Sequence, residues 1–180
     1  MTASDDLLRR IENDPVLAGL LAWPGDFDIG RRDPVEDLRL PTGMPLHPVA
    51  GCGGGGTYFL CGAPGAPHRP VLYADSEGQA ALIAEDLVEA VRLVAVPPYW
   101  RDAGAGHPLD ELEEEMREDH PDIGGLRGRL AAALGIPLPS AEEALARLRA
   151  AAAGTAPDFV PVAAGTDGAE PCEPLFGDRV

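Results

Sequence analysis

Apolar residues alternate with a period of two in the middle of the chain, which is typical of β-strands. Three short stretches, rich in β-branched, aromatic and alanine side chains, share this pattern: residues 57–61, 71–75 and 79–84. A Gly- and Pro-rich loop at 62–69 and a tight turn at 75–78 connect them. Because connections this short join antiparallel neighbours, we expect consecutive antiparallel strands in a small sheet over residues 47–84.

Other apolar positions recur at the spacing of a helix. A first helix is expected from the N-cap candidate Ser4 to Ile11, and a second covers residues 85–96 until Pro97 ends it. Three more helical stripes follow: Leu109, Leu112 and Met116; Ile123, Leu126, Leu130 and Leu134; Ala141, Ala144, Leu145 and Leu148. Ser140 begins the last of these helices with the S-x-x-E form of a capping box.

These elements predict an α+β fold, in which a single domain at residues 1–152 packs helices on a small antiparallel sheet. A chain of 180 residues suffices for one domain with a proper core. Residues 105–152 form a helical C-terminal extension of that domain. The segment 24–45 holds four Pro and three Gly, and the sequence leaves open whether it is an ordered loop or a mobile linker. Residues 153–180, rich in Gly, Pro, Ala and acids, are expected to form a loosely ordered tail.

Charge narrows the classes of partner. The net charge is −16, and all 14 basic residues are Arg, which indicates a GC-rich genome such as an actinobacterial one. The acidic field repels phosphate backbones and anionic membranes, so we expect no nucleic-acid or membrane partner. It attracts a basic protein partner instead. The acidic N-terminus has no signal pattern and no apolar run approaches the ~20 residues of a membrane span, which predicts a cytoplasmic protein.

Catalytic and metal-binding patterns are sparse. The run Gly51–Gly56 superficially resembles a phosphate-binding loop, but the chain has no Lys and a strand follows, so a bend or bulge is expected. His47, Cys52 and His68 occupy adjoining loops, and a metal-dependent or thiol enzyme built on them is the alternative to a binding protein. Their spacing is not that of a zinc site. We expect no cofactor, an accessible Cys52, and a Cys61 that serves as a small core residue.

Two stretches are candidates for partner contact. Residues 110–119 hold seven acids among ten residues, which form either a solvated helix face or an acidic docking face. Tyr99 and Trp100 are residue types favoured as interface anchors, although Trp100 can instead close the helix end against the sheet. The candidate partner-binding residues are Trp100, Tyr99, Glu113, Glu114, Glu118, Asp75 and Glu77.

Residues 46–100 carry a family pattern. A Gly-Gly pair precedes an aromatic strand, a Glu-Gly turn follows, and a strand then runs into a helix. This order resembles the SMI1/KNR4 (SUKH) superfamily and covers roughly a third of the chain. The resemblance implies a single α+β unit and a non-catalytic immunity protein that neutralises a toxin by stoichiometric binding. A basic toxin domain is the expected partner, a regulatory scaffold is a further alternative, and the oligomeric state stays open.

Overall fold

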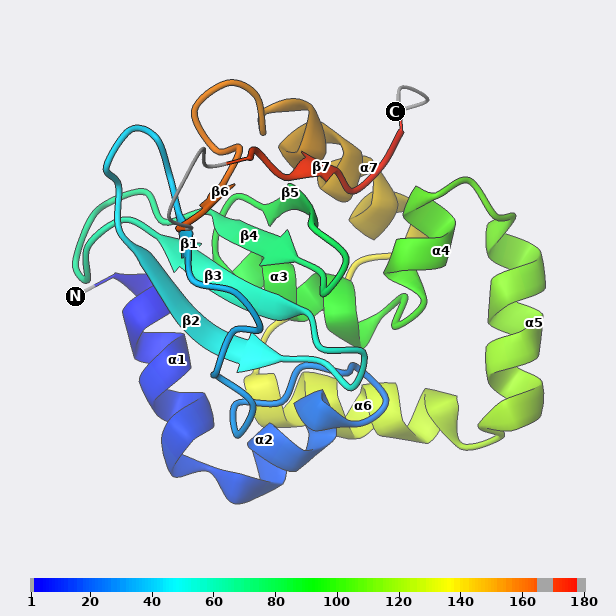
Figure 1. The fold of residues 1–180 in the computed structure, drawn as a ribbon. Helices are drawn as coiled ribbons and strands as arrows, with labels where there is room; N and C mark the ends of the chain where they lie inside the picture. Colours follow the sequence, from blue (N-terminus) through cyan, green and yellow to red (C-terminus); the bar gives the residue numbers. More distant parts are fainter. Residues whose placement is uncertain (1, 165–169, 178–180) are drawn as a thin grey trace.

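The computed structural model describes residues 2–164 and 170–177. In these residues a central mixed sheet has the strand order β2-β3-β4-β5-β7 (Figure 1). Its strands are β2 (Leu46–Gly51), β3 (Thr57–Cys61), β4 (Val71–Ala74), β5 (Gln79–Ala84) and β7 (Glu173–Pro174). Strands β2 to β5 pair antiparallel with their neighbours in sequence, whereas β7 lies parallel to β5. The α+β class and the three consecutive antiparallel strands are confirmed.

Both faces of the sheet are covered, which explains why every residue of β3 is buried. On one face Tyr58 and Leu60 belong to the main core, together with residues from helices at both ends of the chain. On the other face Phe59 and Cys61 pack with a smaller cluster that includes Leu40. The apolar and aromatic side chains of β3 therefore serve two cores, as in a strand buried on both sides.

The helices surround this sheet. They are α1 (Ala3–Asn13), α2 (Pro15–Ala22), α3 (Leu87–Ala95), α4 (Trp100–Gly104), α5 (Leu109–Asp119), α6 (Ile123–Leu134) and α7 (Ala141–Ala153). The predicted capping box of α7 is present: the Glu143 amide donates to Ser140 Oγ at 3.1 Å, and the Ser140 amide donates to Glu143 Oε2 at 3.0 Å. None of the helices in the described residues is long and apolar enough to cross a membrane.

Helix α1 begins earlier than the sequence predicts. Thr2, not Ser4, is the N-cap, and it forms a capping box with Asp5. Ser4 is the second residue of α1 and is buried, and its Oγ accepts a hydrogen bond of 3.2 Å from the Leu87 amide. The hydroxyl that suits an N-cap thus ties α1 to the first residue of α3.

The Pro-rich segment 24–45 is an ordered loop. Asp28 forms a bridge with Gly51 at the end of β2, and Leu40 is buried under the sheet. Within the segment, β1 (Leu38–Arg39) pairs antiparallel with β6 (Val162–Ala163). The segment therefore runs from the edge strand β2, where Asp28 pairs, to the smaller core, where Leu40 packs with Phe59.

The end of the chain differs from the loosely ordered tail expected from composition. Thr155 Oγ1 accepts a 2.9 Å hydrogen bond from the Leu82 amide of β5. The Glu173 and Leu175 amides donate to the carbonyls of Gly78 and Ala80 at 2.9 and 3.1 Å. These bonds satisfy backbone groups that an uncovered edge of β5 would expose. The predicted tail also includes residues 165–169 and 178–180, which lie outside the described residues.

Candidate functional site

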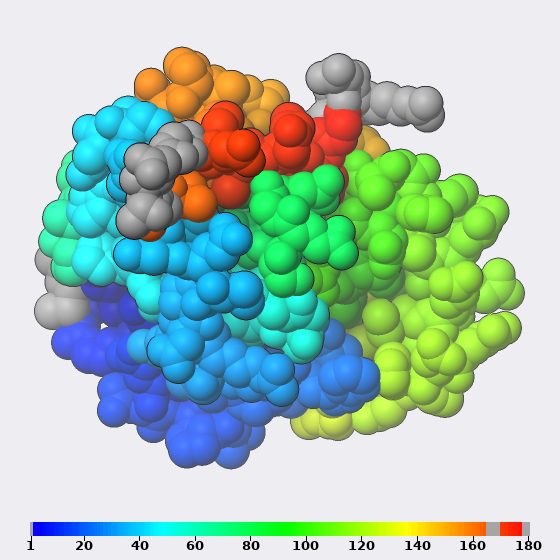
Figure 2. All heavy atoms as spheres, in the orientation of Figure 1, coloured from blue at the N-terminus to red at the C-terminus, as the bar shows by residue number. Residues whose placement is uncertain are grey.

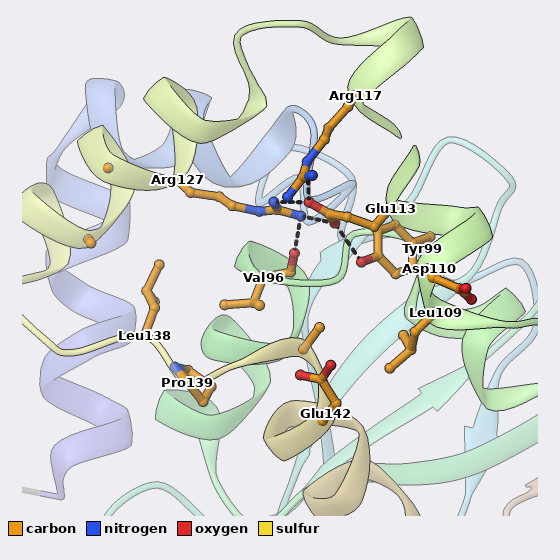
Figure 3. A pocket seen from close by; sticks show the side chains of 13 residues that line it. Val96, Tyr99, Leu109, Asp110, Glu113, Arg117, Arg127, Leu138, Pro139 and Glu142 are labelled. Atoms are coloured by element: carbon orange, nitrogen blue, oxygen red, sulfur yellow. Dashed lines mark hydrogen bonds and ion pairs between the residues drawn. The ribbon is translucent and has the colours of Figure 1, made fainter. Parts of the chain in front are cut away.

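Helix α5 stands apart from the sheet (Figure 1). Together with α6 and the start of α7 it encloses an open cleft, which Figure 3 shows from close by. The cleft has a volume of about 520 Å³. Its walls combine apolar and charged side chains: Val96, Tyr99, Leu109, Asp110, Glu113, Arg117, Arg127, Leu138, Pro139 and Glu142. We call this feature the α5–α6 cleft. It is a shape that can receive a side chain or a short segment of a partner.

An ion-pair network crosses the wall of the α5–α6 cleft (Figure 3). Arg127 donates from both terminal nitrogens to the two carboxylate oxygens of Glu113, at 2.7 and 2.9 Å. The Tyr99 hydroxyl donates to the same carboxylate at 2.6 Å. The hydrogen bond with Arg127 holds the pKa of Glu113 down at about 2, against an ordinary value of 4.5, with the Tyr99 bond adding to the effect and burial opposing it. Glu113 is therefore a half-buried structural anion, and it is not a free charge on the rim.

The other acids of α5 remain at the surface. Asp110, Glu111, Glu114, Glu115, Glu118 and Asp119 are exposed, and none of these six forms an ion pair with another described residue. The apolar stripe of the helix, Leu109, Leu112 and Met116, is partly buried against Tyr99, Ala103 and Leu145. Two of the predicted site residues, Glu114 and Glu118, thus lie on an accessible acidic face.

Trp100 and Tyr99 do not present their rings to a partner. Trp100 is fully buried and meets the Tyr73 ring edge-on, with ring centroids 5.2 Å apart. Tyr99 is also buried, and its hydroxyl is used by Glu113. Both assignments as partner contacts are corrected, because α4 begins directly beneath the sheet and its first turn completes the aromatic part of the core.

The turn residues Asp75 and Glu77 have different roles. Asp75 Oδ1 accepts hydrogen bonds from the amides of Glu77 and Gln79 at 2.9 and 2.8 Å, so it closes the turn. Glu77 is exposed at the tip. The Ser76 hydroxyl donates to the Gly54 carbonyl at 3.0 Å. This contact brings the 75–78 turn beside the glycine turn at residues 53–56, between β2 and β3, on the face shown in Figure 2.

The structure does not assemble His47, Cys52 and His68 into a site. Cys52 is only 2 % exposed, which corrects the expectation of an accessible thiol. His47 lies opposite Leu60 in the β2–β3 pair, and His68 is exposed in the 62–69 loop. No group of three or more His, Cys, Asp or Glu side chains suited to a metal ion occurs among the described residues. Cys61 is buried in the smaller core, as expected.

Cys52 instead belongs to a polar cluster that the sequence analysis missed. We call it the Cys52 cluster, and it consists of Asp26, Cys52, Tyr73 and Arg101, which come from four separate segments of the chain. Arg101 connects its members, since its guanidinium reaches Cys52 Sγ at 3.2 Å and Asp26 Oδ2 at 3.2 Å. The only sequence signal was a Cys followed by four Gly, because the partners are distant in sequence.

Trp23 is a second missed residue. Its side chain is 57 % exposed at the end of α2, and it meets the ring of His120 edge-on at 4.8 Å between centroids. His120 directly follows the acidic helix α5. A signal was present in the sequence, because Pro15 to Trp23 contains no charged residue.

Comparison with known proteins leaves function to be inferred from the residues: no protein-family model, curated protein or solved structure matches the chain.

Proposed function

We propose that this chain is a non-catalytic, cytoplasmic binding protein of the SUKH-like immunity type, which neutralises a basic toxin domain by stoichiometric association. The observation that carries the proposal is the exposed acidic face of α5, next to the α5–α6 cleft. The resemblance to the SUKH pattern supports the choice of a toxin as partner. The 46–100 pattern lies on the β2–β5 sheet and α3, and α5 is an addition to it.

The acidic face keeps its charge in the folded protein. Glu113 is neutralised by Arg127 and by Arg117, whose Nε lies 3.2 Å from Glu113 Oε1. Among the described residues, the ion pairs of Arg117 and Arg127 with α5 are both made to Glu113. The six exposed acids therefore contribute an uncompensated negative potential at the surface. Such a surface accelerates encounter with a basic partner and selects against acidic ones.

Apolar anchors flank the acidic face. The α5–α6 cleft offers Val96, Leu109 and Leu138 beside the first turn of the helix. At the other end of α5, Trp23 meets the His120 ring edge-on and leaves more than half of its surface in solvent. Large exposed aromatic side chains are favoured as centres of binding energy. A partner that spans α5 can therefore gain affinity at both ends of the helix and charge complementarity between them.

The mechanism is occlusion of the toxin by a tightly held complex, without turnover. The test is surface plasmon resonance with the C-terminal domain of a toxin candidate from a neighbouring gene. Glu114→Arg together with Glu118→Arg should lower the association rate about tenfold at low salt, with a smaller effect on dissociation. Raising the salt concentration should reduce the difference.

The matched control reverses the same number of charges elsewhere. Asp33 and Glu36 are exposed in the 24–45 segment and form no ion pair with another described residue. The Asp33→Arg and Glu36→Arg double variant should keep most of the association rate. Equal slowing by both double variants would show that only net charge matters, and no binding of the toxin domain by the natural protein would reject the proposal.

A further inference from the structure

Three groups converge on the sulfur of Cys52. The Gly56 amide lies 3.2 Å from Sγ and Arg101 Nη1 lies 3.2 Å from it, while the Tyr73 hydroxyl oxygen lies 3.3 Å away. Neither an amide N–H nor a guanidinium can accept a proton, so two of the three contacts can only be donated to the sulfur. The protonation state of Cys52 therefore depends on whether Tyr73 donates to the sulfur or accepts from it.

Tyr73 is already used as an acceptor. Arg101 Nη1 donates to its hydroxyl oxygen at 2.6 Å, so the hydroxyl hydrogen is directed to the remaining neighbour, Cys52 Sγ. The sulfur then receives three hydrogen bonds and has no acceptor for a proton of its own. A thiolate satisfies this arrangement. In a neutral thiol one hydrogen has no partner: the S–H if Tyr73 donates to the sulfur, or the Tyr73 hydroxyl hydrogen if the S–H donates to Tyr73.

From this geometry we propose that Cys52 is held as a thiolate by Arg101, and that it is the site at which hydrogen peroxide oxidises the protein. One cation, Arg101, then faces two anions, the Cys52 thiolate and Asp26. Arg101 pairs at its other end with Asp26, whose Oδ1 accepts the Gly53 amide at 2.8 Å. Tyr58 of β3 also borders the cluster, and its hydroxyl donates to the Asp26 carbonyl at 3.4 Å.

Acid–base behaviour agrees with the geometry. Burial alone would raise the pKa of Cys52, but the hydrogen bonds from Tyr73 and Arg101 outweigh it, so the pKa of this thiol is lowered. Cys61 provides the contrast, because burial raises its pKa to about 12. The pKa of Cys172 is also raised by burial. One thiol of the three is therefore prepared for nucleophilic attack.

Glycines make the cover over this sulfur thin. Gly53 and Gly54 are exposed, and a Cβ built at Gly54 would lie 3.9 Å from Cys52 Sγ. Gly53 to Gly56 contribute no side chains to shield the sulfur beneath them. Peroxide, which is close to water in size, can reach the sulfur where a bulky aromatic disulfide reagent cannot.

The reaction is a two-electron oxidation of sulfur. The thiolate attacks one oxygen of hydrogen peroxide, an S–O bond forms, and the O–O bond breaks with loss of hydroxide. The product is a sulfenic acid, and the hydroxide takes its proton to leave sulfenate and water. The Gly56 amide and the Arg101 guanidinium then face the new anion.

The test treats the folded full-length protein with hydrogen peroxide, removes the excess, and then unfolds it in dimedone, which traps sulfenic acids. Unfolding gives the trap access to all three cysteines, and mass spectrometry locates the adduct. Cys52 should be labelled about tenfold or more over Cys61 and Cys172, which serve as internal controls. Arg101→Met should remove this preference, whereas Arg149→Met, which removes an exposed arginine on α7, should leave it unchanged. Equal labelling of the three cysteines, or labelling of Cys172 in preference to Cys52, would overturn the proposal.

A second measurement does not depend on the Arg101 variant folding. The ultraviolet absorbance of the natural protein minus that of Cys52→Ala is measured against pH and reports the Cys52 thiolate. This difference should already be present at neutral pH. In the Tyr73→Phe background, a milder perturbation of the same contacts, it should develop at higher pH. Absorbance that develops only in the range of an ordinary thiol would contradict a thiolate held by Arg101. Neither measurement involves a toxin, so this proposal and the binding function can fail separately.

Discussion

Arg127 binds both carboxylate oxygens of Glu113 and, through the same Nη2, donates to the Val96 carbonyl at 2.5 Å. One side chain thus joins α5, α6 and the end of α3. Helix α5 has no fully buried residue, so its few apolar contacts do not by themselves fix its position. The pair between Arg127 and Glu113 therefore sets the orientation of the acidic face that we propose binds the partner.

Removing the carboxylate charge of Glu113 should destabilise the protein. Because the folded pKa of about 2 lies below the ordinary 4.5, the pair contributes stability above the unfolded pKa and loses it as the pH falls from about 4.5 to 2. Glu113→Gln should lower the free energy of unfolding at pH 7 by about 2–3 kcal/mol and flatten its decline in this acid range. Urea titration at several pH values measures both effects. Glu114→Gln is the control, and an equal loss from it would contradict a special role for Glu113.

The two tryptophans should behave in opposite ways. Trp100→Ala removes a fully buried ring and should cost about 3–5 kcal/mol of stability. Trp23→Ala removes an exposed ring and should change stability by less than about 1 kcal/mol, while it raises the dissociation rate of the complex. Melting temperatures and binding kinetics of the two variants separate these roles. A large loss of stability from Trp23→Ala would show that its contact with His120 is structural.

The sheet could be predicted because its signals are local. The turn at Asp75–Gly78 and the alternation in residues 57–61 each lie within a few residues. Such local signals can be read from the sequence because they do not depend on distant contacts. Ser4 shows the limit of this reasoning. A serine followed by acids suits an N-cap. In the folded chain, however, the Ser4 hydroxyl accepts a hydrogen bond from the Leu87 amide, and Thr2 is the cap.

The site was harder to predict because its determinants are distant in sequence. Glu113 was grouped with the other acids of α5, since nothing nearby marks Arg127 as its partner, 14 residues away. Cys52 was expected to be exposed because it stands in a glycine run, whereas Tyr73 and Arg101 bury it. Long-range contacts of this kind leave no periodic signal in one sequence.

Gly56 should not tolerate a side chain. A Cβ at this position would lie 2.1 Å from the Tyr73 hydroxyl, so Gly56→Ala must displace the ring that holds the Cys52 cluster together. We expect a loss of about 1–3 kcal/mol. Gly54→Ala is the matched control, since the nearest atom there is 3.9 Å away. Chemical denaturation of both variants provides the comparison, and equal stability would show that Tyr73 can move without cost.

The last prediction concerns Gly104 and Phe176. A Cβ at Gly104, the final residue of α4, would lie 2.3 Å from the Phe176 ring, which is buried against Trp100. Gly104→Ala should therefore destabilise the natural protein, even though Ala is favoured over Gly in helices by about 1 kcal/mol. Phe176→Ala should itself cost about 3–5 kcal/mol, and it should speed hydrogen exchange of the Glu173 and Leu175 amides as β7 leaves β5.

The effect of Gly104→Ala on the free energy of unfolding should change sign when Phe176 is also replaced. In the Phe176→Ala background the space beside Gly104 is free, so Gly104→Ala should become neutral or stabilising. A double-mutant cycle measured by urea denaturation gives this coupling directly. Additive losses from the two substitutions would show that Phe176 does not rest on α4 in solution, and the C-terminal segment would then leave the edge of β5 open to other strands.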